Sequence, residues 1–222
     1  MNKLKEMSRE LALLLSIPLV KTIYFLLNNP GRGAVSLVTD IDRNTPFIKE
    51  FIVPYISWYV FVFAVLIYFC FKDRKIYHIS LIAINLSLLI CYVIYIVFQT
   101  TVPRPQLAGN DIFTQMVEFI YSIDRPFNCF PSIHCLTSFI LIMAINRSKI
   151  KNRINFGIIT GISVTIILST FFIKQHVILD AIAAILLGRA VFNLVYKIDI
   201  ERIGKWFRKQ YSLLTMKRKL GT

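Results

Sequence analysis

Six long apolar runs constrain this chain more than any other feature of its sequence. Most approach the roughly 20 residues that a helix needs to cross the hydrocarbon core of a bilayer. Charged residues make up only 17% of the chain, whereas soluble domains usually carry about a quarter. We therefore predict an all-α membrane protein with six transmembrane helices at Leu11–Leu27, Phe51–Phe71, Ile76–Phe98, Ser132–Ile145, Ile154–Ile173 and His176–Tyr196. The fourth run is short, so we expect its outer end inside the protein.

The basic residues indicate how these helices are oriented. The chain has 26 Lys and Arg against 12 Asp and Glu, a net charge of +14. Most of these cations lie near the N-terminus, in the connections 72–75 and 147–153, and after Tyr196. Because cytoplasmic loops concentrate Lys and Arg, we expect both termini in the cytoplasm, with residues 197–222 as a basic tail. Residues 1–222 are then one multi-pass domain in the cell membrane.

The positive charge needs no nucleic acid partner. Membrane topology and attraction to anionic membrane lipids account for it, so lipids are the expected partners. The sequence defines no oligomeric state.

Ionisable residues at the outer ends of the predicted helices form a candidate site. Charged groups at membrane depth are costly, so they favour a functional hypothesis. His134 lies at the start of the fourth helix, and His176 opens the sixth. Asp180 follows His176 by one helical turn and is expected on the same face. Arg104 ends the connection that leads to the same region, so four functional side chains are predicted on the extracytoplasmic side.

These groups suit phosphoryl transfer. A carboxylate that accepts one ring N–H of His176 leaves the other nitrogen as a base or nucleophile. His134 can act as the acid for a leaving oxygen, and Arg104 is a planar cation suited to phosphate. Ser132 begins a helix whose free N–H groups form an anion site. Two His and one Asp could also hold zinc, but Ser132 and Arg104 favour phosphate; no metal and no cofactor are expected.

These motifs resemble the signatures of the type 2 phosphatidic acid phosphatase superfamily, which are Lys-x6-Arg-Pro, Pro-Ser-x-His and Ser-Arg-x5-His-x3-Asp. The second signature is intact at Pro131–His134. The third runs from Ser169 to Asp180, with Thr170 in place of the arginine. The first survives only as Arg104-Pro105. The lysine position falls at Val97, so two of the family's three phosphate cations are missing.

The resemblance implies a role for each matching residue. His176 would be the nucleophile, Asp180 its orienting partner and His134 the acid, while Arg104, Ser132 and Ser169 would hold phosphate oxygens. The third signature, with Lys174 before Gln175 and His176, is similar to the inositol phosphorylceramide synthase branch. Lys174 is expected to replace a missing cation, and Lys21 is a weaker candidate for the same task.

The sequence thus predicts a metal-independent enzyme that hydrolyses a lipid phosphate or diphosphate through a phosphohistidine. Phosphatidic acid, phosphatidylglycerol phosphate and polyprenyl diphosphate are the candidate substrates. One alternative is a lipid phosphotransferase, in which a lipid or sugar hydroxyl replaces water as the acceptor. Another is a non-catalytic lipid-binding or transport protein on the same scaffold.

Overall fold

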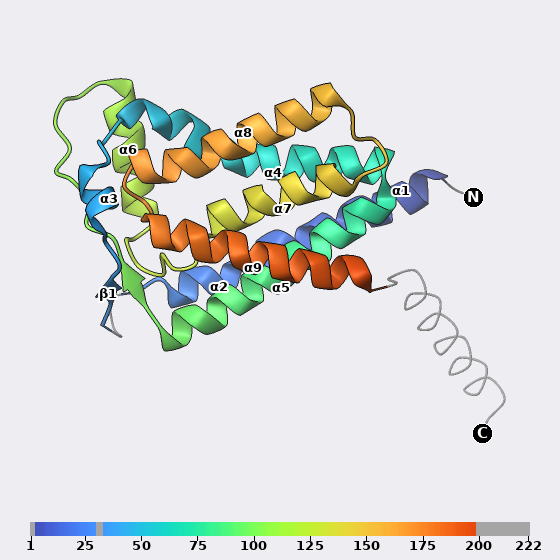
Figure 1. The fold of residues 1–222 in the computed structure, drawn as a ribbon, viewed down its shortest axis with the longest axis horizontal. Helices are drawn as coiled ribbons and strands as arrows, with labels where there is room; N and C mark the ends of the chain where they lie inside the picture. The colour runs from blue at the N-terminus through green and yellow to red at the C-terminus, as the bar shows by residue number, and fades with distance from the viewer. Residues whose placement is uncertain (1–2, 30–32, 199–222) are drawn as a thin grey trace.

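In the computed structural model, long helices lie side by side along one axis, and the polar connections gather at its two ends (Figure 1). Residues 3–29 and 33–198 are described. The helices are α1 (Lys3–Ala12), α2 (Ser16–Leu27), α3 (Asp40–Asn44), α4 (Ile52–Lys72), α5 (Arg74–Val97), α6 (Ile112–Ile123), α7 (Ile133–Arg147), α8 (Arg153–Phe172) and α9 (Ile178–Lys197). Short 3-10 turns lie at Leu13–Leu15 and Lys49–Phe51. Two short strands, β1 (Val35–Ser36) and β2 (Thr100–Thr101), pair in parallel.

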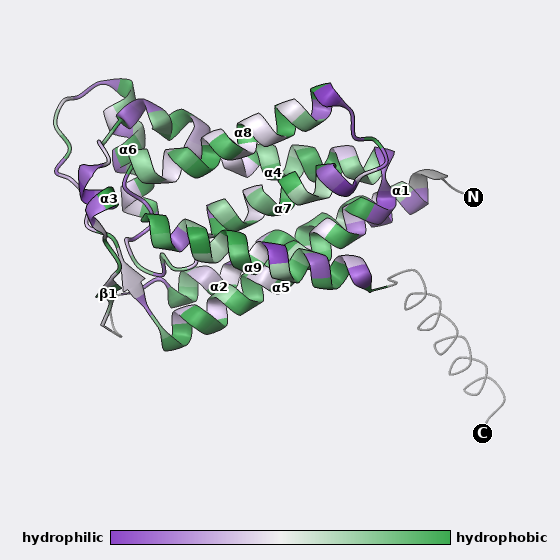
Figure 2. Cartoon of the chain, viewed as in Figure 1, coloured by the Kyte–Doolittle hydropathy of each residue, from purple (hydrophilic) through white to green (hydrophobic). Residues whose placement is uncertain are grey.

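Among the described residues, five helical segments are long and apolar enough to cross a membrane, at Lys5–Leu27, Lys49–Lys72, Arg74–Val97, Arg153–Phe172 and Ile178–Lys197. Figure 2 shows apolar residues along their lengths and hydrophilic residues gathered toward the ends of the bundle. The structure thus agrees with the predicted helical character, and five of the six predicted spans have the length and apolar composition to cross a membrane.

Helix α7 corresponds to the predicted short fourth span. It has 15 residues, which at about 1.5 Å per residue is shorter than the roughly 30 Å hydrocarbon core. It lies in the interior and packs against α5, α8 and α9. Most of its side chains are buried, including Leu136 and Ile140. Its polar residues can therefore lie inside the protein rather than in contact with lipid.

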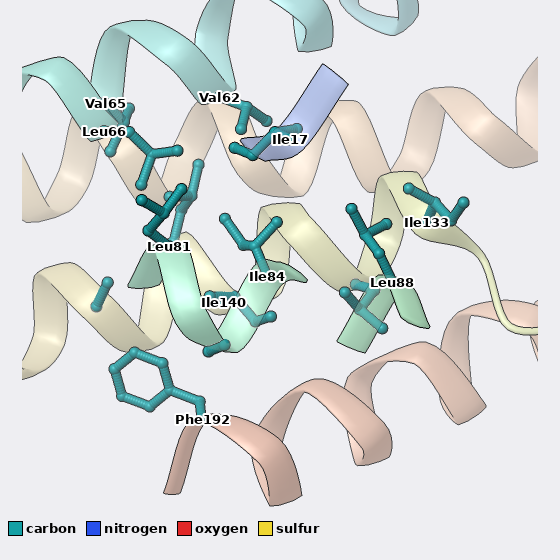
Figure 3. Packing of buried hydrophobic residues seen from close by; sticks show 14 of the residues in the cluster. Ile17, Val62, Val65, Leu66, Leu81, Ile84, Leu88, Ile133, Ile140 and Phe192 are labelled. Carbon is teal, nitrogen blue, oxygen red and sulfur yellow. The ribbon is translucent and has the colours of Figure 1, made fainter. Parts of the chain in front are cut away.

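One apolar core joins the helices around α7. Figure 3 shows Ile133 and Ile140 of α7 among side chains of α4, α5 and α9. Gly188 lets α9 approach closely, since a Cβ added there would lie 3.4 Å from the Ile140 side chain and 3.5 Å from the Leu136 carbonyl oxygen. This packing fixes the ends of α7 and α9 relative to each other.

The two ends of the bundle differ in their residues. One end holds α1 and the α4–α5 and α7–α8 connections (Figure 1), with Arg74, Lys149 and Arg153. The other end holds α3, β1, β2, α6 and the α8–α9 turn. We call it the site end because His134, His176 and Asp180 lie there. The predicted basic tail 197–222 lies outside the described residues except for Lys197 and Ile198.

Candidate active site

His176 and Asp180 form the first part of the site. The Nδ1 atom of His176 lies 3.2 Å from Oδ2 of Asp180, and the two side chains are 9% and 0% exposed. The same Oδ2 accepts a hydrogen bond from the Val177 N–H at 3.0 Å. A carboxylate facing Nδ1 places the ring proton there and leaves Nε2 with its lone pair. The pair thus presents an oriented imidazole with one free nitrogen.

The prediction that His176 opens the sixth predicted helix is wrong. Helix α9 begins at Ile178, and His176 lies in the turn before it. Lys174 in this turn has a φ of 51°, and the N–H groups of Gln175 and His176 both donate to the Thr170 carbonyl, at 2.9 and 3.1 Å. These bonds hold the His176 ring beside the Asp180 carboxylate, although His176 lies outside α9.

His134 faces His176 from the start of α7, with 5.9 Å between the ring centroids. Its ring packs against Tyr55 and Trp58, with centroids at 4.4 and 4.2 Å. His134 is 7% exposed. Neither of its ring nitrogens has a hydrogen-bond partner among the described residues. The aromatic packing holds the ring in place, with both ring nitrogens buried and unpaired among the described residues.

Ser132 connects the two histidine segments. Its N–H donates to the Asp180 carbonyl at 3.2 Å, and its hydroxyl accepts from the Cys135 N–H at 3.3 Å as the cap of α7. The neighbouring Pro131 carbonyl accepts from the Tyr95 hydroxyl at 2.6 Å. Ser132 is fully buried, so it ties α7 to α9.

Two cavities meet at His176. The first, here called the histidine cavity, has a volume of about 250 Å³ and is lined by His134, His176, Lys21 and Asp124, with aromatic rings around them. The second, the cationic cavity, has about 300 Å³ and is lined by the residues His176, Arg43, Arg104, Lys174 and Asp42. His176 therefore borders both cavities.

Arg104 lies in the cationic cavity but is already bonded to the protein. Its Nη1 donates to the Tyr121 carbonyl at 2.9 Å, and its Nη2 donates to the Asp124 carbonyl at 2.5 Å and to Gln175 Oε1 at 2.8 Å. Its guanidinium also lies 4.1 Å from the centre of the Tyr121 ring. Arg104 thus supports the turn that carries His176 and brings positive charge beside it.

Lys174 lines the same cavity from the turn. Its ammonium donates to the carbonyls of Asp42, at 2.8 Å, and Thr45. Burial lowers the pKa of Lys174, and the Asp42 carboxylate opposes that shift. Together with Arg104 and Arg43, Lys174 makes this cavity electropositive, which suits an anion.

The remaining signature positions line neither of these two cavities. Ser169 is fully buried, and its hydroxyl donates to the Ile166 carbonyl at 2.6 Å. Thr170, at the arginine position, is also buried, and its hydroxyl donates to the Ile167 carbonyl at 2.7 Å. Val97, at the lysine position, is 78% exposed on the outside of α5. Among the described residues no group of three or more His, Cys, Asp or Glu is placed to hold a metal ion.

Asp42 is a supporting residue that the signatures do not include. Its Oδ1 accepts from the Ile178 N–H at 2.8 Å, at the start of α9, and its Oδ2 accepts from the Thr39 N–H at 2.8 Å. Asp42 therefore fixes α3 against the turn that holds His176. The only sequence signal was a group of acidic residues in the first polar connection.

Comparison with known proteins identifies the family to which the chain belongs. No curated protein and no solved structure matches the chain. A family match covers residues 76–203, which include His134, His176 and Asp180. The matched segment is more than half of the chain, and the chain therefore belongs to the PAP2 superfamily.

Proposed function

We propose that the protein hydrolyses a lipid phosphate or diphosphate in the membrane through a phosphohistidine on His176. Members of the PAP2 superfamily are phosphoesterases, so the chain is an enzyme of the phosphatase kind. The observation that carries the finer proposal is the oriented His176–Asp180 pair, with the His134 ring 5.9 Å from the His176 ring and both histidines lining one cavity.

In the first step, Nε2 of His176 attacks phosphorus while the bond to the leaving oxygen breaks. Protonated His134 gives its proton to that oxygen, and the dephosphorylated lipid leaves. Asp180 stabilises the positive charge that develops on the His176 ring. Arg104 and Lys174 supply positive potential beside the transferred group.

In the second step, water attacks the phosphohistidine. His134, now neutral, takes a proton from the water, the P–N bond breaks and inorganic phosphate leaves. His134 is then protonated again and ready for the next cycle. A lipid or sugar hydroxyl in place of water would make the same residues a phosphotransferase.

We further propose six spans, with α7 added to the five long helical segments, and the site end outside the cell. The cations of the α4–α5 and α7–α8 connections support a cytoplasmic position for the opposite end. Lipid phosphates in the outer leaflet would then reach the site directly.

The test is phosphate release by the purified protein in detergent, in EDTA, from a panel of lipid monophosphates and diphosphates. We expect release from one class of lipid and its loss, by about 10³-fold or more, in His176→Ala. Glu50→Ala, which changes an exposed residue at the same end, is the control and should keep the activity. Headgroup transfer to an added hydroxyl acceptor without phosphate release would favour the phosphotransferase. Full activity of His176→Ala would exclude the phosphohistidine.

A further inference from the structure

A third cavity continues from the site into the middle of the bundle. It has a volume of about 180 Å³ and shares Lys21, Trp58, Tyr59 and Ile133 with the histidine cavity. Beyond these residues its lining is almost entirely apolar, with Ile17, Pro18, Val62, Phe63, Ile84 and Leu88. We call it the apolar slot. Figure 3 shows Ile17, Val62, Ile84 and Leu88 in the packing between α2, α4 and α5.

The slot runs along the bundle axis and away from the histidines. On α4, Val62 lies one turn beyond Trp58, and on α2, Ile17 lies one turn beyond Lys21, in both cases toward the opposite end. On α5, the lining residues Leu88 and Ile84 follow one another in the same direction. The slot therefore has the direction of a lipid chain whose headgroup lies at the site end.

The polar atoms of the slot lie in the part nearer the histidine cavity. The Thr137 hydroxyl already donates to the Ile133 carbonyl at 2.8 Å and accepts from the Trp58 indole N–H at 2.7 Å. The deeper lining offers hydrocarbon only. The Tyr92 hydroxyl also lines the slot, one turn nearer the site end than Leu88, without a hydrogen-bond partner among the described residues. Apolar cavities take apolar ligands, and the deeper part of the slot is of this kind.

Lys21 places a positive charge where the slot meets the histidine cavity. Its ammonium lies 5.1 Å from the centre of the Trp58 ring and 4.3 Å from that of the Tyr59 ring, across from α2 to α4. A cation above an apolar channel matches an anionic headgroup joined to a hydrocarbon chain. The phosphate of such a lipid would lie between Lys21 and the two histidines.

We propose that the apolar slot binds one hydrocarbon chain of a phosphorylated lipid, with the phosphate held beside Lys21. This inference rests on the proposed function, which it extends from the phosphate to the lipid that carries it. Chain length then contributes to substrate choice, because methylenes buried in the slot add binding energy that a short chain lacks.

The experiment compares one substitution on two faces of the same helix. Val62→Phe fills the slot, whereas Val60→Phe lies on the outer face of α4, where Val60 is 73% exposed. For dipalmitoyl phosphatidic acid we expect Val62→Phe to lower kcat/KM about tenfold, the equivalent of roughly two buried methylenes. For water-soluble dibutanoyl phosphatidic acid both variants should match the wild type. An equal loss of kcat/KM for both substrates in Val62→Phe would contradict the proposal that the slot binds a lipid chain.

A binding measurement keeps the test independent of catalysis. Trp58 lines the slot, and Trp206→Phe removes the second tryptophan. In a His176→Ala background, phosphatidic acid with brominated chains should quench Trp58 fluorescence, with a Kd about tenfold weaker in Val62→Phe than in Val60→Phe. Equal Kd values for the two variants would contradict lipid binding in the slot, even if the protein hydrolysed no lipid. If Val62→Phe does not fold, Ile17→Phe on the lipid-facing helix α2 replaces it.

Discussion

At the scale of single residues, one carboxylate oxygen of Asp180 contacts both the His176 ring and the Val177 N–H. Asp180 Oδ2 faces the His176 ring and also accepts the Val177 N–H, while its Oδ1 has no hydrogen-bond partner among the described residues. The carboxylate is fully buried. Its charge is therefore available to the His176 ring with little screening by water, which strengthens the interaction as the ring becomes positive.

Replacing Asp180 by asparagine tests this role. The amide keeps the shape of the side chain and can still accept the Val177 N–H, but it no longer stabilises a positively charged His176. We expect kcat for phosphate release to fall by about 10²–10⁴-fold while the thermal unfolding midpoint changes little. Glu118→Gln, which changes an exposed carboxylate on α6 at the same end, should behave like the wild type. An Asp180→Asn protein with normal kcat would remove Asp180 from the mechanism.

At the scale of elements, the helix ends opposite the site are held by a buried cap. Asp73 caps α5 through the Ile76 N–H, at 3.3 Å. Its other oxygen accepts from the Ser148 hydroxyl at 2.7 Å and from the Lys149 N–H at 2.9 Å. One side chain thus joins the α4–α5 corner to the connection that follows α7.

Asp73→Ala should therefore lower the stability of the protein and leave the catalytic rate of the folded protein unchanged. It removes the cap and leaves buried donors unpaired, so we expect unfolding to become easier by about 2–4 kcal/mol. Replacing Asn152, the exposed N-cap of α8, by Ala should lower the free energy of unfolding by only about 1 kcal/mol. Unfolding in detergent measures both, and kcat of the folded protein should be unchanged. Similar losses in the two variants would mean that the buried bonds contribute nothing.

The local parts of the site could be predicted from the sequence, and the distant ones could not. Asp180 was expected beside His176 because the two are only four residues apart, and Ser132 was expected at the start of a helix because helix starts are signalled locally. The bond from Asp42 to Ile178 joins residues 136 positions apart. No periodicity or spacing reports such a contact. For the same reason, the bonds from Arg104 to the carbonyls of Tyr121 and Asp124 could not be predicted.

At the scale of the whole molecule, the division into two ends determines which groups meet which compartment. The four cysteines, Cys70, Cys91, Cys129 and Cys135, are all buried and free. Exposed positions are available at both ends, at Glu118 on α6 and at Lys149 after α7. The native protein is therefore a suitable background for labelling introduced cysteines.

For the proposed topology, an impermeant maleimide should label Glu118→Cys in intact cells. Lys149→Cys should be labelled only after permeabilisation, and the wild type not at all. The reverse pattern would place the site end in the cytoplasm. Labelling of both variants in intact cells would rule out an arrangement in which the membrane separates the two ends.

The bonds between α3 and the turn before α9 also have a consequence for biosynthesis. Asp42 and Thr45 are made early, but their partners Lys174 and Ile178 are made only with α9 and the turn before it. His176 and Asp180 are synthesised in the same late stretch of the chain. Before α9 is synthesised, the bundle therefore lacks the contacts that hold α3 against the turn carrying His176.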